Sequence, residues 1–133
     1  MKRKAIIVQQ SEDGQRCIAV DKENAEELLS FFMQDKRYTK KFNHICEIIL
    51  GNRINRELFD KEKPDDKSTG VRAMKFFKGQ ENSRVYCKEV VLEDTTFVVI
   101  DAEVLVRKKQ TKLKHQELQI IHKVASYEYT ETE

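Results

Sequence analysis

Cationic, phenolic and carboxylate side chains recur along two consecutive segments in the second half of the chain. Arg84, Tyr86 and Lys88 alternate in the first segment, and Asp101 and Glu103 alternate in the second. Successive side chains of a strand point to opposite faces, so alternate residues share a face. An arginine presents a planar fork of donors that suits a phosphate. The set therefore predicts a face for an anionic partner, and RNA is the partner that we expect.

We expect these two segments to pair as an antiparallel hairpin. Residues 84–91 and 96–106 are rich in β-branched side chains, and Glu93-Asp94 provides the turn between them. In this register one face of the hairpin is apolar and should be buried. That face carries Val85, Cys87, Val91, Val98, Ile100, Ala102, Val104 and Val106.

The other face of the hairpin is expected to stay open. It sets Arg84 opposite Glu103 and Tyr86 opposite Asp101, and it continues to Arg107 at the end of the second strand. A carboxylate opposite an arginine can hold the guanidinium in position for a phosphate. The same pair is also an ordinary cross-strand ion pair, so the residues alone leave both interpretations open.

A basic segment follows the second strand. Between residues 107 and 123 a single acid, Glu117, stands against a run of cations. The cations are Arg107, Lys108, Lys109, Lys112, Lys114 and Lys123. Such a run is also typical of an ordinary solvated surface. The net charge of the chain is only +2, so any nucleic-acid signal has to be local, as it is here.

The remaining pattern predicts one domain of the α+β class over residues 1–133. We expect an antiparallel β-sheet of about four to five strands, with an N-terminal helical hairpin on one face and a C-terminal helix. The expected parts are a β-hairpin at 1–20, a helical hairpin at 21–52, a loop at 53–70, the β-sheet core at 71–106, and a basic turn with the C-terminal helix at 107–129.

Local signals set the limits of the helices. Asp21 is expected to cap a first helix over residues 21–34. A second helix should occupy residues 39–50, because its apolar residues follow helical spacing and Gly51-Asn52 supply a stop.

Cysteine usage and hydropathy bear on the compartment. Cys17, Cys46 and Cys87 lie far apart with no paired spacing, which indicates free thiols in a reducing compartment. The apolar run at residues 5–8 is too short for the core of a signal peptide, and no stretch approaches a membrane span. We therefore expect a cytoplasmic protein. No glycine-rich phosphate loop or metal-ligand spacing occurs, so no cofactor and no metal is expected.

In the order of its elements, the chain resembles the RelE/HigB-like toxins of the RelE/ParE toxin-antitoxin superfamily. The matching residues are Arg84 and Tyr86 near the start of the central strand, Lys108-Lys109-Gln110-Thr111-Lys112 after the last strand, Glu117-Leu118 and Tyr127. The resemblance covers residues 71–127, and the helical half agrees in layout only.

Members of this family cleave mRNA on the ribosome without a metal, by activating a ribose 2′-hydroxyl against the adjacent phosphate. The resemblance therefore implies an endoribonuclease (mRNA interferase), which needs a base, a cation for the charge on the phosphorane and an acid. Arg84 matches the family's arginine at the scissile phosphate. Candidates for the base are Glu103, Asp101 and His115. Tyr86 or a lysine is the candidate for the acid.

The resemblance also implies that the basic turn holds the RNA backbone. The candidate RNA-binding residues are Lys75, Lys88, Arg107, Lys108, Lys109, Lys112 and His115. The implied partners are the ribosome with its mRNA and a cognate antitoxin protein, with neither a membrane nor a small-molecule cofactor. An acidic, partly disordered antitoxin segment would suit a basic open face.

A non-catalytic relative is the alternative from another functional class. It would act as a protein-binding module, like the gyrase-poisoning branch of the superfamily, or as an RNA-binding domain without activity. Arg84 with Tyr86 and Lys88 beside it favours the nuclease, whereas the lack of an evident base favours the binding module. The expected fold is the same for both.

Overall fold

The computed structural model of the protein describes residues 2–61, 70–77, 83–105 and 114–133. These residues form a seven-stranded sheet, in the spatial order β3-β4-β5-β6-β2-β1-β7, and three helices. The strands are β1 (Lys2–Gln10), β2 (Arg16–Asp21), β3 (Phe59–Lys61), β4 (Val71–Lys75), β5 (Arg84–Val91), β6 (Phe97–Leu105) and β7 (Glu128–Thr132). The helices are α1 (Ala25–Phe32), α2 (Lys36–Leu50) and α3 (Lys114–Ser126).

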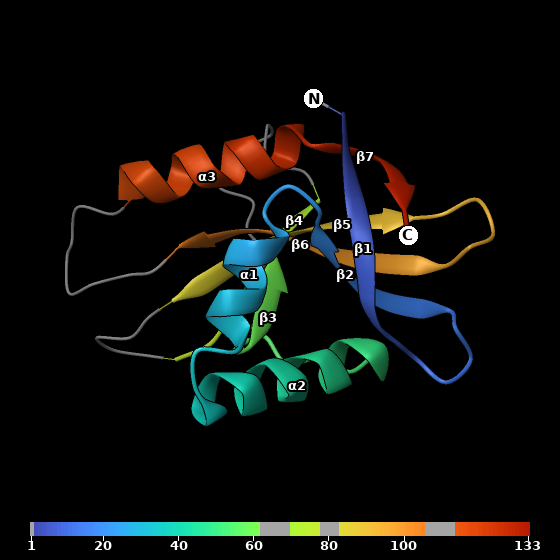
Figure 1. The fold of residues 1–133 in the computed structure, drawn as a ribbon, viewed down its shortest axis with the longest axis horizontal. Coiled ribbons are helices and arrows are strands. Elements are labelled where there is room, and N and C mark those ends of the chain that lie inside the picture. Colours follow the sequence, from blue (N-terminus) through green and yellow to red (C-terminus); the bar gives the residue numbers. More distant parts are fainter. Residues whose placement is uncertain (1, 62–69, 78–82, 106–113) are drawn as a thin grey trace.

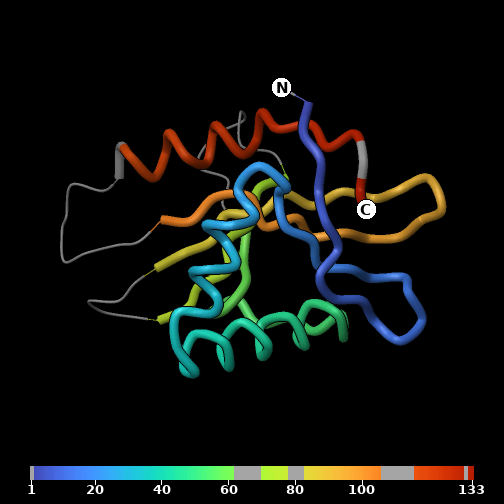
Figure 2. The backbone as a smooth tube through the Cα atoms, viewed as in Figure 1, coloured from blue at the N-terminus to red at the C-terminus, as the bar shows by residue number. Residues whose placement is uncertain are grey.

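The α+β class expected from the sequence is confirmed, but the sheet is larger than expected and mixed. β2 pairs with β6 in parallel. β1 pairs with β7 in parallel as well, because the chain returns after α3 and runs beside β1 (Figure 2). Two strands lie outside the expectation: β3 is within the segment predicted as a loop, and β7 follows the last helix. β3 has only three residues and β7 carries mainly polar side chains, so neither shows the apolar alternation of a half-buried strand.

The helices cover both faces of the sheet (Figure 1). α1 and α2 lie on one face, and α3 lies along the other. Under α1 and α2 a cluster of aromatic rings fills the core, with the ring centroids of Phe32 and Phe42 only 3.9 Å apart. Under α3, Ile121 and Val124 pack in one cluster with Tyr86. The face of β5 that the sequence predicts to stay open, which carries Tyr86, is therefore covered by α3.

Polar side chains shift the helix starts from their expected positions. The Asp35 carboxylate accepts the backbone N–H of Tyr38 at 3.0 Å, so α2 begins earlier than its apolar residues indicate. Asp21 accepts the backbone N–H of Asn24 at 3.2 Å and forms the turn before α1 instead of its N-cap. The stop of α2 at Gly51 is confirmed.

The register of the β5-β6 hairpin differs from the expected one. The ladder is already one residue out at the turn, where Val91 lies opposite Phe97 and not Thr96, so Cys87 lies opposite Asp101. An irregularity between Tyr86 and Cys87 adds one more residue and sets Tyr86 opposite Glu103. Arg84 is consequently displaced from Glu103. The expected pairs of Arg84 with Glu103 and of Tyr86 with Asp101 are both wrong.

The position of β6 within the sheet explains this error. β6 lies between β5 and β2 and is covered on both faces. Val99 packs with Cys87 under α1 and α2, whereas Val98 and Ile100 belong to a separate cluster. Because both faces of such a strand are apolar, alternation alone cannot tell one face from the other.

Two further sequence expectations bear on the class of protein. Within the described residues, no helix combines the length and the apolar character that crossing a membrane requires. Cys17, Cys46 and Cys87 are free thiols, as the sequence predicts, and the structure adds that all three are buried. Burial raises the pKa of all three thiols.

Candidate functional site

The Arg84 side chain lies at the start of β5, on the face covered by α3. Its Nη1 atom is 3.7 Å from Oε1 of Glu117, in the first turn of α3. The Tyr86 hydroxyl donates to the same Glu117 oxygen at 2.8 Å. The side chains of Arg84 and Glu117 are 18% and 17% exposed, so solvent reaches the ion pair, whereas Tyr86 is fully buried.

Lys75 completes this group from the neighbouring strand. It lies directly opposite Arg84 in the antiparallel β4-β5 pair, and directly opposite residues share a face of the sheet. We call Arg84, Lys75, Glu117 and Tyr86 the Arg84 cluster. In it a guanidinium and a carboxylate form an ion pair at one end of β5, and Lys75 lies beside Arg84 in the sheet.

Glu103 lies apart from Arg84 and fastens the other end of α3 to the sheet. It accepts hydrogen bonds from the Asn24 side chain and, at 2.9 Å, from the Tyr127 hydroxyl. It also forms an ion pair with Lys123 at 3.6 Å. Burial and the hydrogen bond to Glu103 raise the pKa of Tyr127 above its usual range. The carboxylate that braces Arg84 is therefore Glu117 and not Glu103.

Lys88 binds the C-terminal end of α3. Its Nζ atom donates to the backbone carbonyls of Ala125 at 2.7 Å and Tyr127 at 2.6 Å. These carbonyls carry the partial negative charge of a helix end, which favours a cation there. Burial lowers the pKa of Lys88. The ammonium that the sequence places among the RNA-binding groups is thus directed at a helix terminus.

Asp101 lies on the opposite face of the sheet and is fully buried. The Cys87 thiol donates to its Oδ1 atom at 3.0 Å, and Oδ2 has no hydrogen-bond partner among the residues that the structure describes. Burial raises the pKa of Asp101 to about 7, against a smaller opposite effect of the Cys87 hydrogen bond. The expectation that Asp101 faces Tyr86 is wrong.

The basic turn that the sequence predicts to hold the RNA backbone is not among the described residues. Arg107, Lys108, Lys109 and Lys112 lie outside the described residues, and so does the side chain of His115.

Glu117 is the residue of the Arg84 cluster that the strand pattern did not indicate. It lies one helical turn before Ile121 and two before Val124, which are buried. Helical spacing therefore places it on the side of α3 that faces the sheet. A polar residue in line with a buried helical stripe is the signal that points to it.

The Arg84 cluster has the groups that phosphate chemistry requires. Arg84 and Lys75 can donate to phosphate oxygens, and the Glu117 carboxylate can accept a proton. No group of three or more His, Cys, Asp or Glu side chains suited to a metal ion occurs in the described ranges. No family model, curated protein or solved structure matches the chain.

Proposed function

We propose that the chain is a RelE/HigB-like toxin that cleaves mRNA on the ribosome in the cytoplasm, with a cognate antitoxin as its second partner. The observation that carries the proposal is the solvent-accessible ion pair of Arg84 with Glu117, with Lys75 beside it. A site without a metal needs a cation, an acid and a base to cleave RNA through attack by a ribose 2′-hydroxyl.

Each group of the Arg84 cluster has a role in the proposed reaction. The Glu117 carboxylate takes the proton of a ribose 2′-hydroxyl, whose oxygen attacks the adjacent phosphorus. As the new O2′–P bond forms, the P–O5′ bond breaks, leaving a 2′,3′-cyclic phosphate and a 5′-hydroxyl. Arg84 donates to the non-bridging oxygens as their charge grows, and Lys75 gives a proton to the leaving oxygen. The Tyr86 hydroxyl holds Glu117 in position.

Toe-printing of translating ribosomes after induced expression tests this function. We expect cuts at defined codon positions with the native chain. Arg84→Ala should lower the cleavage rate about a hundred- to thousandfold, or about 3–4 kcal/mol, while ribosome affinity stays unchanged. The reason is that Arg84 acts on charge that develops only in the transition state. Cleavage at the native rate by Arg84→Ala would contradict the proposal.

Two glutamine variants separate the base from a structural carboxylate. Glu117→Gln keeps the hydrogen-bond acceptor for Tyr86 but removes the base, so the acid limb of the pH-rate profile should flatten. Glu103→Gln is the matched control, because Glu103 contacts α3 and not Arg84. Its variant should keep the native pH dependence even where stability falls.

A non-catalytic binding module is the second candidate, and one observation favours it. α3 buries Tyr86 and takes the Lys88 ammonium, whereas Arg84, at an edge of the described part of the predicted open face, stays accessible to solvent. An edge of this kind can bind RNA phosphates or a protein without chemistry. Ribosomes that bind the chain while their mRNA stays intact would decide for this candidate.

A further inference from the structure

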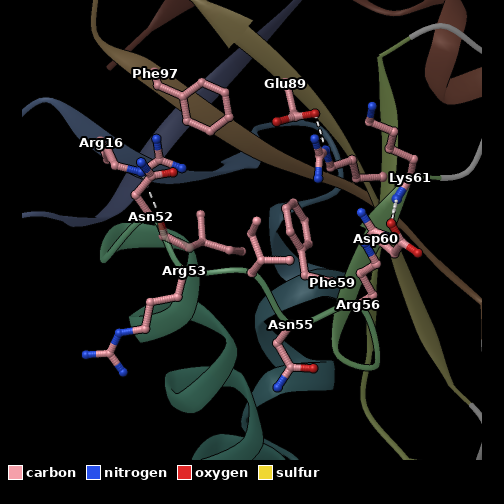
Figure 3. A pocket seen from close by; sticks show the side chains of 13 residues that line it. Arg16, Asn52, Arg53, Asn55, Arg56, Phe59, Asp60, Lys61, Glu89 and Phe97 are labelled. Carbon is pink, nitrogen blue, oxygen red and sulfur yellow. Dashed lines mark hydrogen bonds and ion pairs between the residues drawn. The ribbon is translucent and has the colours of Figure 1, made fainter.

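A basic cleft opens beside the C-terminal end of α2 (Figure 3). It lies on the face of the sheet that α1 and α2 cover, opposite the face of the Arg84 cluster. Its volume is about 620 Å³. Strands β2, β4, β5 and β6 contribute to one side, and the segment after α2 and strand β3 contribute to the other. We call it the arginine cleft. Its basic residues are Arg16, Arg53, Arg56, Lys61 and Arg72.

Two of these arginines are already fixed by contacts within the protein. Arg16 donates through Nε to the backbone carbonyl of Ile49 at 2.7 Å, and its guanidinium lies 4.3 Å from the centre of the Phe97 ring. The guanidinium of Arg72 lies 5.4 Å from the centre of the Phe59 ring. Such contacts hold the donors before a ligand arrives, which reduces the entropy that binding costs.

The charges that line the arginine cleft are not balanced. Five basic residues stand against two acids, Asp60 and Glu89, and Glu89 is already hydrogen-bonded to Arg72. Burial lowers the pKa of Arg16, with Glu89 opposing this shift and Arg72 adding to it. Arg16 and Arg72 therefore repel each other across the cleft, and a bound anion would relieve that repulsion.

The rim of the cleft adds exposed cations around an aromatic ring. Arg53, Arg56 and Lys61 are all exposed. Phe59 stands between the side of the cleft that carries Arg16 and the side that carries Lys61 (Figure 3). Cations on both sides of a ring suit a ligand that alternates negative charges with flat groups.

We propose that the arginine cleft binds single-stranded RNA. The arginine forks take backbone phosphates, and unpaired bases stack on the guanidinium planes and on the rings of Phe59 and Phe97. The side-chain amides of Asn52 and Asn55 lie in the same lining and can hydrogen-bond to base edges. An acidic peptide would use the forks but leave the flat surfaces without a partner.

This binding does not rest on cleavage. The arginine cleft and the Arg84 cluster lie on opposite faces of the sheet, so one can fail without the other. Arg84→Ala should leave the affinity of the cleft for RNA unchanged, and loss of the cleft should leave the Arg84 cluster intact.

Fluorescence anisotropy with a labelled oligouridylate of about twelve nucleotides tests the proposal. Arg53→Gln, Arg56→Gln and Lys61→Gln together remove the rim charges at exposed positions without changing the buried contacts. We expect at least a tenfold weaker affinity for this triple variant. The slope of log K against log salt should become shallower by about 2, because each lost phosphate contact removes its own counterion release.

A second triple variant, Lys2→Gln, Lys36→Gln and Lys40→Gln, is the matched control. It removes the same charge at exposed positions that do not line the cleft, so its affinity should stay within about twofold of the native value. Equal losses in the two triples would show attraction by net charge alone and overturn the proposal. Polyglutamate that binds as tightly as the RNA, with the same dependence on the rim residues, would overturn it in favour of an acidic peptide.

Glu89→Gln gives a test in the opposite direction. It removes one of the two negative charges of the lining and releases Arg72 from its carboxylate partner. RNA affinity should therefore rise several-fold, whereas unchanged or weaker affinity would show that the RNA does not contact this part of the cleft.

Discussion

Two aspartates, both fully buried and close together in the sheet, have opposite surroundings. Asp101 lies opposite Val20 in the β2-β6 pair, and Asp21 is the next residue of β2. Arg3 donates to both oxygens of Asp21, at 2.5 and 3.1 Å, and the Tyr129 hydroxyl donates at 2.7 Å. Asp101 receives the Cys87 thiol, and its other oxygen has no partner in the part of the chain that the structure describes.

The difference shows two ways in which one fold accommodates a buried carboxyl group. A carboxylate that keeps its charge needs a cation and enough donors, and Asp21 has them. A carboxyl group without a cation avoids the cost of desolvation by keeping its proton, and burial raises the pKa of Asp101 accordingly. Asp21 should therefore be compatible with a stable fold only while Arg3 and Tyr129 bind it. Asp101 should be compatible with a stable fold only while its carboxyl group is protonated.

The largest expected effect comes from removing the cation of Asp21. Arg3→Met should lower the free energy of unfolding by roughly 5 kcal/mol, because it leaves a buried carboxylate without its cation. It also removes the guanidinium that lies 4.0 Å from the centre of the Tyr127 ring. Urea denaturation measures the loss. Lys2→Met, at an exposed position of the same strand, should change stability by less than about 0.5 kcal/mol.

The second-largest expected effect is a dependence of the free energy of unfolding on pH, which comes from Asp101. Its folded pKa of about 7 lies above the ordinary 3.8, so the unfolded chain loses this proton first as pH rises. The stability that the neutral carboxyl contributes is complete below about pH 4 and is lost as pH rises through about 7, by roughly 4 kcal/mol at pH 8. The free energy of unfolding should be measured for Asp101→Asn and for the native chain from pH 4 to pH 8. Over this range the difference between the two chains should change by about this amount, in favour of the variant.

A matched surface variant checks that this difference belongs to Asp101. Glu12→Gln changes an exposed carboxylate, so its stability relative to the native chain should not vary over the same pH range. A flat difference for Asp101→Asn as well would mean that the buried carboxyl ionises as freely in the folded chain as in the unfolded one.

The smallest expected effect comes from removing Lys88, whose ammonium binds the C-terminal end of α3. Lys88→Met removes two hydrogen bonds to the end of α3 and should cost about 1–2 kcal/mol. Amide exchange should quicken mainly in the last turn of that helix. Lys123→Met, which loses an ion pair of a largely exposed ammonium with Glu103, should cost less than about 0.5 kcal/mol. Equal losses in both variants would show that the cap of α3 contributes nothing beyond a surface charge.

The bounds of the β5-β6 hairpin could be predicted from the sequence, whereas its register could not. The bounds of β5 and β6 follow from β-branched residues on either side of a Glu93-Asp94 turn, and the structure agrees closely. The register failed because β6 is apolar on both faces. An aspartate in such a strand is predicted to point to solvent. Nothing in the sequence shows that the Cys87 thiol, across the hairpin, donates a hydrogen bond to Asp101.

The candidate site was predictable in part. Arg84 was identified from its residue type and position, and its placement next to Lys75 follows from the β4-β5 pair. Glu117 was missed as its partner because the contact depends on where α3 crosses the sheet, which no local pattern records. The arginine cleft was missed for a similar reason. Its cations come from β2, β4 and the segment around β3, which are far apart in the sequence.

The parallel pairing of β1 with β7 sets the order in which the molecule can assemble. In this pair Lys2 lies opposite Glu128, so nearly the whole described chain separates the two strands. During synthesis β1 leaves the ribosome first and must wait, with one backbone edge unpaired, until β7 follows. The ring of Tyr127 and the hydroxyl of Tyr129, which shelter Arg3 and Asp21, arrive equally late. Burial of that ion pair is therefore among the last events of folding, and a nascent chain stalled before Tyr127 would keep it exposed to water.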